Sequence, residues 1–457
     1  MILDQAARQL DDPIVAVATG DSRTAIGVIR LSGPGARVDA VLAGCVRLHN
    51  PAPLLPGRVR RFDLIDPGTG EPVDSGLLLR FVAPRSYTGE DVVEFSLHGN
   101  PVLLELGLAV LQAAGARAAG PGEFTRRAVI HGKLNLLQAE AVAATIDAET
   151  KTAARLAKRH LGGELTERID SWKAQLLVSA AGLEAIIDFP EEVDESELDV
   201  SMRMLAESLR EMSELAESYS AGRSLVRGWS VVITGPVNAG KSTLFNRLLD
   251  HDRAIVSPQA GTTRDTIAET VTWSGLRLRI QDTAGLRSTE DPVELAGISR
   301  SEDATSSADL AIQVRDGRQL STNDPSPPGP SGTATTLWVA SHADLLSKAA
   351  CIGLTEHGWL VVGGGGRVEV EAVQRAASTA LTSGGPKDGL MIHTARQHHA
   401  LRSASSHLAE AVNQGLAEPV LAAFAIRAAT ESLEEFVGRW DSEEVLDVLF
   451  EHFCIGK

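Results

Sequence analysis

The chain has 457 residues, with 60 acidic and 43 basic side chains and a formal net charge of −17. This surplus of negative charge opposes non-specific nucleic-acid binding, so an RNA partner needs a local basic patch or a second protein. The three cysteines form neither a metal-ligand pattern nor a disulfide framework, and no segment has the length and apolarity of a membrane span or a secretory signal. We therefore expect a cytoplasmic protein of two to four domains with no membrane contact.

The first 121 residues predict an α/β domain. Residues 102–114 have the apolar spacing of a helix. Four apolar runs separated by Gly/Pro turns predict strands, and they occupy residues 14–18, 26–31, 77–81 and 92–97.

From residue 122 onward the pattern becomes helical. Glycine and proline are rare in residues 136–189, and apolar residues recur there at three- and four-residue steps. The acidic run at 188–199 predicts a solvated loop, after which helix resumes over 202–225. Residues 390–457 again predict helices, which we expect to pack against those of 122–225.

The central motif is Gly235-Pro236-Val237-Asn238-Ala239-Gly240-Lys241-Ser242, which has the form G-x-x-x-x-G-K-S. An apolar run at 231–234 precedes it and a helical pattern at 243–249 follows, which is the strand–loop–helix context of a phosphate-binding P-loop. In such a loop the backbone amides face phosphate oxygens, Lys241 reaches the β- and γ-phosphates, and the Ser242 hydroxyl binds Mg²⁺.

Two further segments fit a GTPase. Asp282-Thr283-Ala284-Gly285 follows the predicted strand 276–281, where a carboxylate holds Mg²⁺ through water and the glycine amide senses the γ-phosphate. Between the two lies Ala260-Gly261-Thr262-Thr263-Arg264-Asp265, in which Thr263 supplies a second hydroxyl to Mg²⁺. The order and spacing of the three predict a Ras-like domain at 226–385. Its only antiparallel strand would be the one before the Ser274-Gly275 turn, and its predicted strands are 229–234, 269–273, 276–281, 310–314, 336–340 and 359–362.

The guanine-reading segment departs from the usual N-K-x-D. It reads Ser341-His342-Ala343-Asp344, which keeps the carboxylate that accepts from guanine but loses an amide and a long basic stem. Four glycines, 363–366, replace the S-A-x motif. Leu286 stands where Ras-type enzymes carry a water-orienting glutamine.

Four segments outside these motifs carry a resemblance to a known family. They read Tyr87-Thr88-Gly89-Glu90-Asp91-Val92-Val93-Glu94, Pro121-Gly122-Glu123-Phe124-Thr125-Arg126-Arg127-Ala128, the run from Gly132-Lys133-Leu134-Asn135 to Ala141, and Phe453-Cys454-Ile455-Gly456-Lys457. With the GTPase motifs they resemble the MnmE (TrmE) family of tRNA-modification GTPases. The resemblance implies a folate-binding, dimerising domain at 1–121, a helical domain formed by 122–225 and 386–457, and a G domain at 226–385.

The resemblance also implies partners and cofactors. A homodimer would join the FAD-dependent protein MnmG in a heterotetramer, and the complex would add a carboxymethylaminomethyl- or aminomethyl-type group to C5 of the wobble uridine in certain tRNAs. A tetrahydrofolate derivative would supply the carbon unit. GTP would be the substrate, with Mg²⁺ and K⁺ as the metal ions.

Site residues follow from the motif positions. The resemblance implies folate contacts at Arg30, Glu94, Lys133 and Lys457. It assigns GTP contacts to Asn238, Ala239, Gly240, Lys241, Ser242, Thr243, Ser257, Pro258, Gln259, Ala260, Gly261, Thr262, Thr263, Asp282, Thr283, Ala284, Gly285, Ser341 and Asp344. Mg²⁺ would bind Ser242 and Thr263, and K⁺ would bind Asn238, Ser257, Gln259 and Thr262. Glu294 would orient the attacking water, and Arg264 and Arg287 complete the catalytic candidates through salt bridges in the switch segments.

Other interpretations remain open at this point. The altered guanine segment also fits a degenerate scaffold that binds folate and MnmG with little GTP turnover, and the G motifs alone fit a ribosome-assembly GTPase. Glu294 can equally be a solvated helix charge. Cys454 can be a nucleophile or a small apolar residue.

Overall fold

The fold is described from a computed structural model. It describes residues 11–20, 22–50, 53–188, 195–250, 268–282, 308–320, 327, 335–363, 367–382, 389–415, 417–438, 450 and 453–456. The chain divides into two compact units. Unit 1 comprises Met1–Ala143, His160–Thr166 and Val437–Lys457, and unit 2 comprises Ala144–Arg159 and Glu167–Phe436.

Unit 1 is built on a seven-stranded sheet with the order β3-β4-β5-β6-β2-β1-β7. Its strands are β1 (Ile14–Val17), β2 (Ile26–Gly33), β3 (Val46–Leu48), β4 (Arg60–Ile65), β5 (Pro72–Phe81), β6 (Asp91–His98) and β7 (Arg117–Ala118). All neighbours pair antiparallel except β1 and β7. The four predicted strands are confirmed. The strands β3, β4 and β7 and the helix α2 (Gly35–Cys45) were not predicted.

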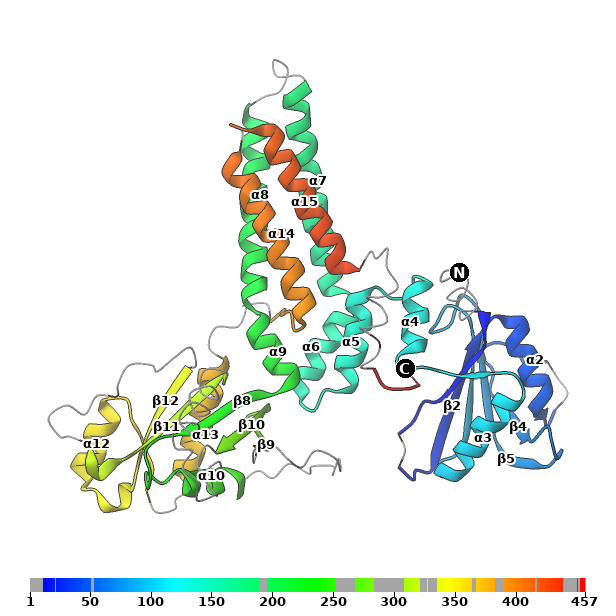
Figure 1. The fold of residues 1–457 in the computed structure, drawn as a ribbon, viewed down its shortest axis with the longest axis horizontal. Coiled ribbons are helices and arrows are strands. Elements are labelled where there is room, and N and C mark those ends of the chain that lie inside the picture. Colours follow the sequence, from blue (N-terminus) through cyan, green and yellow to red (C-terminus); the bar gives the residue numbers. More distant parts are fainter. Residues whose placement is uncertain are drawn as a thin grey trace, which may run out of the picture. The chain divides into compact units, whose positions relative to one another are not determined.

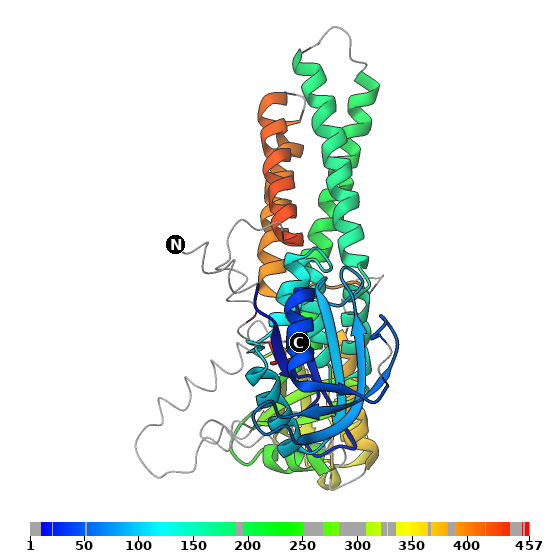
Figure 2. The same cartoon turned by 90° about the vertical axis from the view of Figure 1, so that its right-hand side faces the viewer.

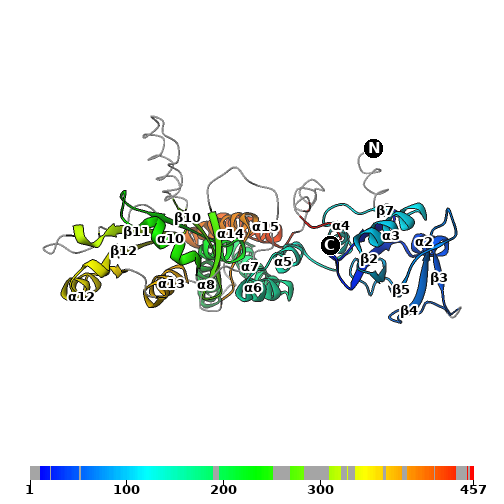
Figure 3. The same ribbon diagram turned by 90° about the horizontal axis from the view of Figure 1, so that it is seen from below.

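Two helices close the core of this sheet. The predicted helix is confirmed as α3 (Pro101–Ala113), and it begins at Asn100, whose side chain accepts a hydrogen bond from the Val102 amide. The helices α2 and α3 lie against the sheet (Figure 3), where Val41 and Leu111 pack with the buried strand residue Phe95. Burial of this apolar face holds the two helices against the sheet.

A buried ion pair joins the sheet to the next helix, α4 (Glu123–Ile130). The Arg127 guanidinium is fully buried and donates to the Glu90 carboxylate at 3.0 Å. The same carboxylate accepts from the Ser32 hydroxyl of β2 at 2.9 Å, and Arg127 also lies 3.2 Å from Glu123. Because every charge in this group has a partner, the group ties α4 to β2 and to the loop before β6.

The long helices of unit 2 form an antiparallel bundle. Its members α7 (Glu164–Asp188), α8 (Glu195–Glu217), α14 (Ala395–Gln414) and α15 (Pro419–Val437) lie side by side (Figures 1 and 2). Lys173 of α7 lies 3.6 Å from Glu434 of α15, and Arg427 pairs with Glu184. The predicted packing of the first helical segment against the last is therefore confirmed for these helices.

The acidic run was predicted wrongly in part. Helix α8 begins at Glu195, so residues 195–199 are helical rather than part of a loop.

A six-stranded sheet forms the rest of unit 2, with the order β13-β12-β11-β8-β10-β9. Its strands are β8 (Trp229–Thr234), β9 (Ala268–Trp273), β10 (Leu276–Asp282), β11 (Leu310–Asp316), β12 (Thr335–Ser341) and β13 (Leu360–Val361). The pairs are parallel except β9 with β10, which turn at Ser274-Gly275. The predicted strands and the single antiparallel strand are confirmed.

Helices cover both faces of this sheet. On one face α10 (Lys241–Asp250) and α13 (Arg367–Thr382) pack through Leu248 and Val373 onto Ile233 of β8. On the other face Leu354 of α12 (Lys348–Glu356) packs against Trp338. No helix among the described residues is long and apolar enough to cross a membrane.

The buried pair allows a test of stability. Arg127→Ala leaves the Glu90 carboxylate buried without its cation, which typically costs about 3–5 kcal/mol. We expect the slowest-exchanging amides of β2 and β6 to lose that much protection in native-state hydrogen exchange. The matched control is Arg58→Ala, which removes an exposed arginine from the same unit. Equal protection in the two variants would contradict a structural role for the pair.

Candidate functional site

The P-loop begins at the end of β8, where the backbone passes so close to β11 that only glycine fits. At Gly235 the backbone has φ of +144°, and a Cβ there would lie 2.1 Å from the carbonyl oxygen of Val314 on β11. Gly240, at the other end of the loop, has φ of +89°. Both glycines therefore permit backbone that other residues rarely adopt, and the loop runs directly into the first turn of α10.

The side chains of the loop are arranged for an anion. The Lys241 ammonium is buried within the loop and donates to the Pro236 carbonyl at 2.7 Å. Ser242 follows in the first turn of α10 and is exposed. Asn238, at the tip of the loop, has φ of +62° and an exposed side chain. A cation, a hydroxyl and the amides at a helix N-terminus are the groups that hold a nucleotide phosphate with Mg²⁺.

Asp282 ends the neighbouring strand at the same edge. In the register of β10 with β8 it lies opposite Ile233, one residue before the end of β8. Since the carboxyl ends of parallel strands meet at one edge of the sheet, the backbone of Asp282 stands beside the P-loop.

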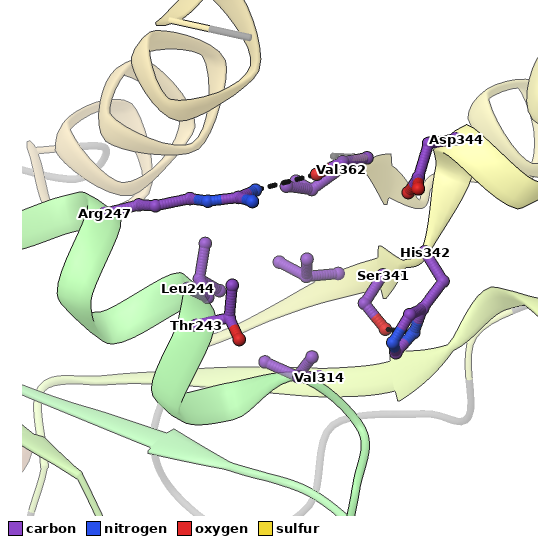
Figure 4. A pocket seen from close by; sticks show the side chains of 11 residues that line it. Thr243, Leu244, Arg247, Val314, Ser341, His342, Asp344 and Val362 are labelled. Atoms are coloured by element: carbon purple, nitrogen blue, oxygen red, sulfur yellow. Dashed lines mark hydrogen bonds between the residues drawn. The ribbon is translucent and has the colours of Figure 1, made fainter. Parts of the chain in front are cut away.

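A pocket of about 190 Å³ adjoins the P-loop. It lies between α10 and the segment after β12, so that Thr243 and Leu244 are on one side and Ser341, His342 and Asp344 on the other (Figure 4). The structure thus brings both predicted guanine-reading residues together with Gly240 and Thr243. Asp344 is exposed at this pocket, where its carboxylate is accessible to a base.

Ser341 and His342 are held by the protein itself. The Ser341 hydroxyl donates to the Arg315 carbonyl at 3.0 Å and lies 2.9 Å from Nδ1 of His342. His342 has φ of +59°, and its Nδ1 lies 3.5 Å from the buried carboxylate of Asp316. The hydrogen bonds from Arg318 lower the pKa of Asp316 to about 2, with a smaller contribution from His342. The Ser341 hydroxyl therefore binds the backbone and the neighbouring ring.

In unit 1 the predicted folate residues Arg30 and Glu94 form an ion pair across β2 and β6. The Arg30 Nη2 and the Glu94 carboxylate are 2.9 Å apart and both side chains are partly exposed. The guanidinium lies over the rings of Tyr87 and Phe124, and it also donates to the Gly456 carbonyl at 3.4 Å. A cation, a carboxylate and two aromatic rings thus meet beside the C-terminal segment.

Lys133 has a different partner from this pair. Its ammonium donates to the Pro84 carbonyl at 3.0 Å, and its side chain packs near Gly89. The loop that carries Pro84 and Gly89 also carries Tyr87, so Lys133 and Arg30 contact the same loop.

Comparison with known sequences decides the family. The sequence family described as the MnmE helical domain matches residues 136–454, and the one described as the GTP-binding protein TrmE N-terminus matches residues 13–133. The tRNA modification GTPase MnmE of Thermus thermophilus is 41% identical over 449 residues, which cover 98% of this chain and 100% of the relative. The chain belongs to the MnmE family of tRNA modification GTPases.

More distant members agree over the same length. MnmE of Caulobacter vibrioides is 37% identical over 458 residues, and MnmE of Koribacter versatilis is 36% identical over 459 residues. Each alignment covers 98% of this chain and 100% of the relative. The family resemblance seen in the sequence is confirmed, and with it the GTPase class and the combination of a TrmE-type N-terminal domain, a helical domain and a Ras-like G domain.

Among solved structures, the FeoB G domain of Methanococcus jannaschii is 20% identical, covers 34% of this chain and 98% of its own, and superimposes with a TM-score of 0.23. This similarity is too low to bear on function.

Several predicted site residues of this MnmE-family chain lie outside the described residues. They are Ser257, Pro258, Gln259, Ala260, Gly261, Thr262, Thr263, Arg264, Thr283, Ala284, Gly285, Arg287, Glu294 and Lys457. Their assigned roles remain predictions, as does the role of the side chain of Asp282.

Sequence reasoning missed Arg247. Its guanidinium extends from α10 and donates to the Gly363 carbonyl at 2.7 Å, so it crosses the base pocket (Figure 4). Arg247 follows Thr243 by four residues, and such residues share a helix face. That spacing could have placed Arg247 beside the predicted nucleotide contacts.

The base pocket generates a prediction about nucleotide affinity. Restoring Ser341→Asn and His342→Lys together should tighten GDP and GTP binding by about tenfold, since each restored hydrogen bond contributes about 0.5–1.5 kcal/mol. Selectivity for GTP over ATP should already be present, because the Asp344 carboxylate accepts from guanine and would face the acceptor N1 of adenine.

Titration of labelled GDP, GTP and ATP against both proteins checks this. Lys348→Gln, an exposed change on the nearby helix α12, is the control and should leave all three affinities unchanged. The interpretation fails if the wild type binds ATP as well as GTP, or if the double variant binds GDP no better.

Proposed function

We propose that this GTPase acts with MnmG to modify C5 of the wobble uridine in certain tRNAs, with a tetrahydrofolate derivative as the carbon donor. The product carries a carboxymethylaminomethyl- or aminomethyl-type group. The chain works as a homodimer, in a heterotetramer with MnmG, in the cytoplasm. The proposed domains are 1–121 for folate binding and dimerisation, 122–225 with 386–457 for the helical part, and 226–385 for GTP.

The arrangement around Arg30 carries the folate part of the proposal. A folate offers a flat pteridine with donor groups along one edge and a glutamate tail with carboxylates. The Glu94 carboxylate, 2.9 Å from Arg30, is partly exposed and can accept from the pteridine edge. Lys133 and Lys457 are proposed to bind the anionic tail. The half-buried ring of Tyr87, already in contact with the Arg30 guanidinium, offers a flat apolar surface.

In the G domain we propose that side chains and backbone amides bind the phosphates, orient the guanine and the attacking water, and neutralise charge. Lys241 and the amides at the start of α10 hold the phosphates, with Ser242 and Thr263 as the proposed Mg²⁺ ligands. The carboxylate of Asp344 orients the guanine. Glu294 is proposed to orient the attacking water, because Leu286 cannot, and Arg264 and Arg287 to fix the switch segments.

A monovalent cation is proposed in place of an arginine finger. Asn238 is exposed at the tip of the P-loop, where its amide oxygen is available to a cation. Ser257, Gln259 and Thr262 complete the proposed set of oxygen ligands. A K⁺ ion held there would supply positive charge beside the β- and γ-phosphates when two G domains meet, and this charge offsets the negative charge that develops during hydrolysis.

One observation favours a second candidate function. A serine and a histidine stand where N-K-x-D has an amide and a lysine, and the Ser341 hydroxyl donates to the Arg315 carbonyl, so the base side of the pocket has fewer polar groups for a guanine. The chain would then be a scaffold that binds folate and MnmG and turns over little GTP. The two candidates differ in turnover and agree in folate binding.

Folate binding is tested at the ion pair. Glu94→Gln removes the charge of the acceptor while keeping its size, so we expect tetrahydrofolate to bind about tenfold more weakly in isothermal titration calorimetry. The control is Glu71→Gln, an exposed carboxylate of the same unit, which should bind normally. GTP turnover should be the same in both. Unaltered folate affinity in Glu94→Gln would remove the main support for this site.

Turnover separates the two candidates. We expect GTP hydrolysis to be about tenfold or more faster in K⁺ than in Na⁺, and Asn238→Ala to abolish this difference while leaving GDP affinity unchanged. Asn246→Ala, an exposed asparagine on α10, serves as the matched control and should keep the K⁺ response. Equal, slow rates in the two salts would favour the scaffold.

A further inference from the structure

A second, larger pocket lies at the opposite edge of the G-domain sheet from the P-loop. Its volume is about 660 Å³, and Trp229, the first residue of β8, lines it, whereas the P-loop follows the last residue of that strand. The other walls come from α6 (Lys151–Leu161), α9 (Tyr219–Arg227), the β9–β10 turn and α13. All lining residues belong to unit 2, and the volume lies in the range of small-molecule sites.

The floor of this pocket is apolar and fixed. Leu156 of α6, Leu225 of α9 and Leu276 of β10 line it and also belong to the buried core that fills this side of the sheet. Trp229 and Leu381 do the same. Because these side chains are packed on their other sides, the pocket keeps its shape without a ligand, and it offers a surface suited to a flat apolar group.

The charged groups that line the pocket are all positive. Arg155 and Arg159 line it from α6 and Arg375 lines it from α13, while none of the described lining residues is acidic. In a chain with 60 acidic and 43 basic residues this is an unusual concentration of cations. The Arg159 guanidinium lies close to Gly389, since a Cβ atom built on that glycine would be 3.4 Å from Nη1 of Arg159.

The floor also holds a buried donor. The Trp229 side chain is nine-tenths buried, with a residue exposure of 6%, and its indole N–H has no acceptor among the described residues. Because this nitrogen has less than 1 Å² of accessible surface, it lies beneath the floor, and the pocket meets the indole through its ring carbons.

We propose that this pocket binds a small organic anion with a flat, fused-ring or aromatic body. The ring packs on the floor of Leu156, Leu225 and Leu276. The carboxylate, sulfonate or phosphate of the ligand binds the arginines. Because α6 and α9 contact the sheet across this pocket, the ligand also fastens these helices to β8, the strand that ends in the P-loop.

The probe for this class is 1-anilinonaphthalene-8-sulfonate, an aromatic anion whose fluorescence rises in an apolar site, titrated into the full-length protein. Its uncharged relative N-phenyl-1-naphthylamine reports the contribution of the anion. We expect the sulfonate to bind at one site, about tenfold more tightly than the uncharged ring. Saturating GDP should not displace it, since the nucleotide pocket is at the other edge of the sheet.

Matched variants locate the binding. Arg155→Gln should weaken sulfonate binding about tenfold, whereas Lys158→Gln, which removes an exposed cation from the same helix outside the pocket, should change it less than about twofold. Ala221→Trp, which fills the pocket from α9, should abolish binding, and Thr379→Trp serves the same purpose from α13 if the first variant does not fold.

Three outcomes would overturn the proposal. They are equal affinities for the charged and uncharged probes, equal losses in Arg155→Gln and Lys158→Gln, and sulfonate binding that survives in folded Ala221→Trp or Thr379→Trp. Displacement of the probe by GDP would place it in the nucleotide pocket and would equally overturn the assignment. None of these measurements depends on GTP turnover, so the result is independent of the proposed function.

Discussion

The close backbone approach between Gly235 and Val314 is the constraint on which the nucleotide site depends. A side chain at Gly235 would meet a carbonyl oxygen at 2.1 Å, so the chain can leave β8 along this path only with glycine there. That path directs the following amides to the carboxyl edge of the sheet and starts α10 at Lys241. The base pocket between α10 and the end of β12 follows from the same geometry.

The two sides of the nucleotide site rest on different physical grounds. The phosphate side is made of backbone conformation and a buried lysine, and a side chain at Gly235 would collide with the Val314 carbonyl. The base side is made of side chains at a strand end, where Ser341 and His342 can bond to Arg315 and Asp316 instead of to a ligand. This difference explains how the base-reading segment can depart from its usual form while the P-loop motif stays intact.

Most of the sheet architecture could be predicted because its strands are continuous apolar runs between glycine and proline turns. β4 escaped prediction because only Phe62 and Leu64 are buried in a strand that also holds Arg60, Arg61 and Asp63. The cationic pocket beside Trp229 escaped prediction because it forms only when α6, α9 and α13 pack against the sheet. Arg247 was missed although its spacing from Thr243 on α10 was available in the sequence. The acidic composition of residues 188–199 predicted a loop, and it did not reveal that helix α8 begins at Glu195.

Residues 453–456 contribute to the surface around Arg30, although they lie far from it in the sequence. Ile455 pairs with Pro121, and Arg30 reaches the Gly456 carbonyl from 426 residues earlier in the chain. Gly456 itself has φ of +96°, and a Cβ there would lie 2.2 Å from the Val17 carbonyl. The surface around Arg30 therefore includes backbone that is synthesised 426 residues after it. Loss of residues 453–456 would leave the strands of unit 1 intact and would remove this cover from Arg30.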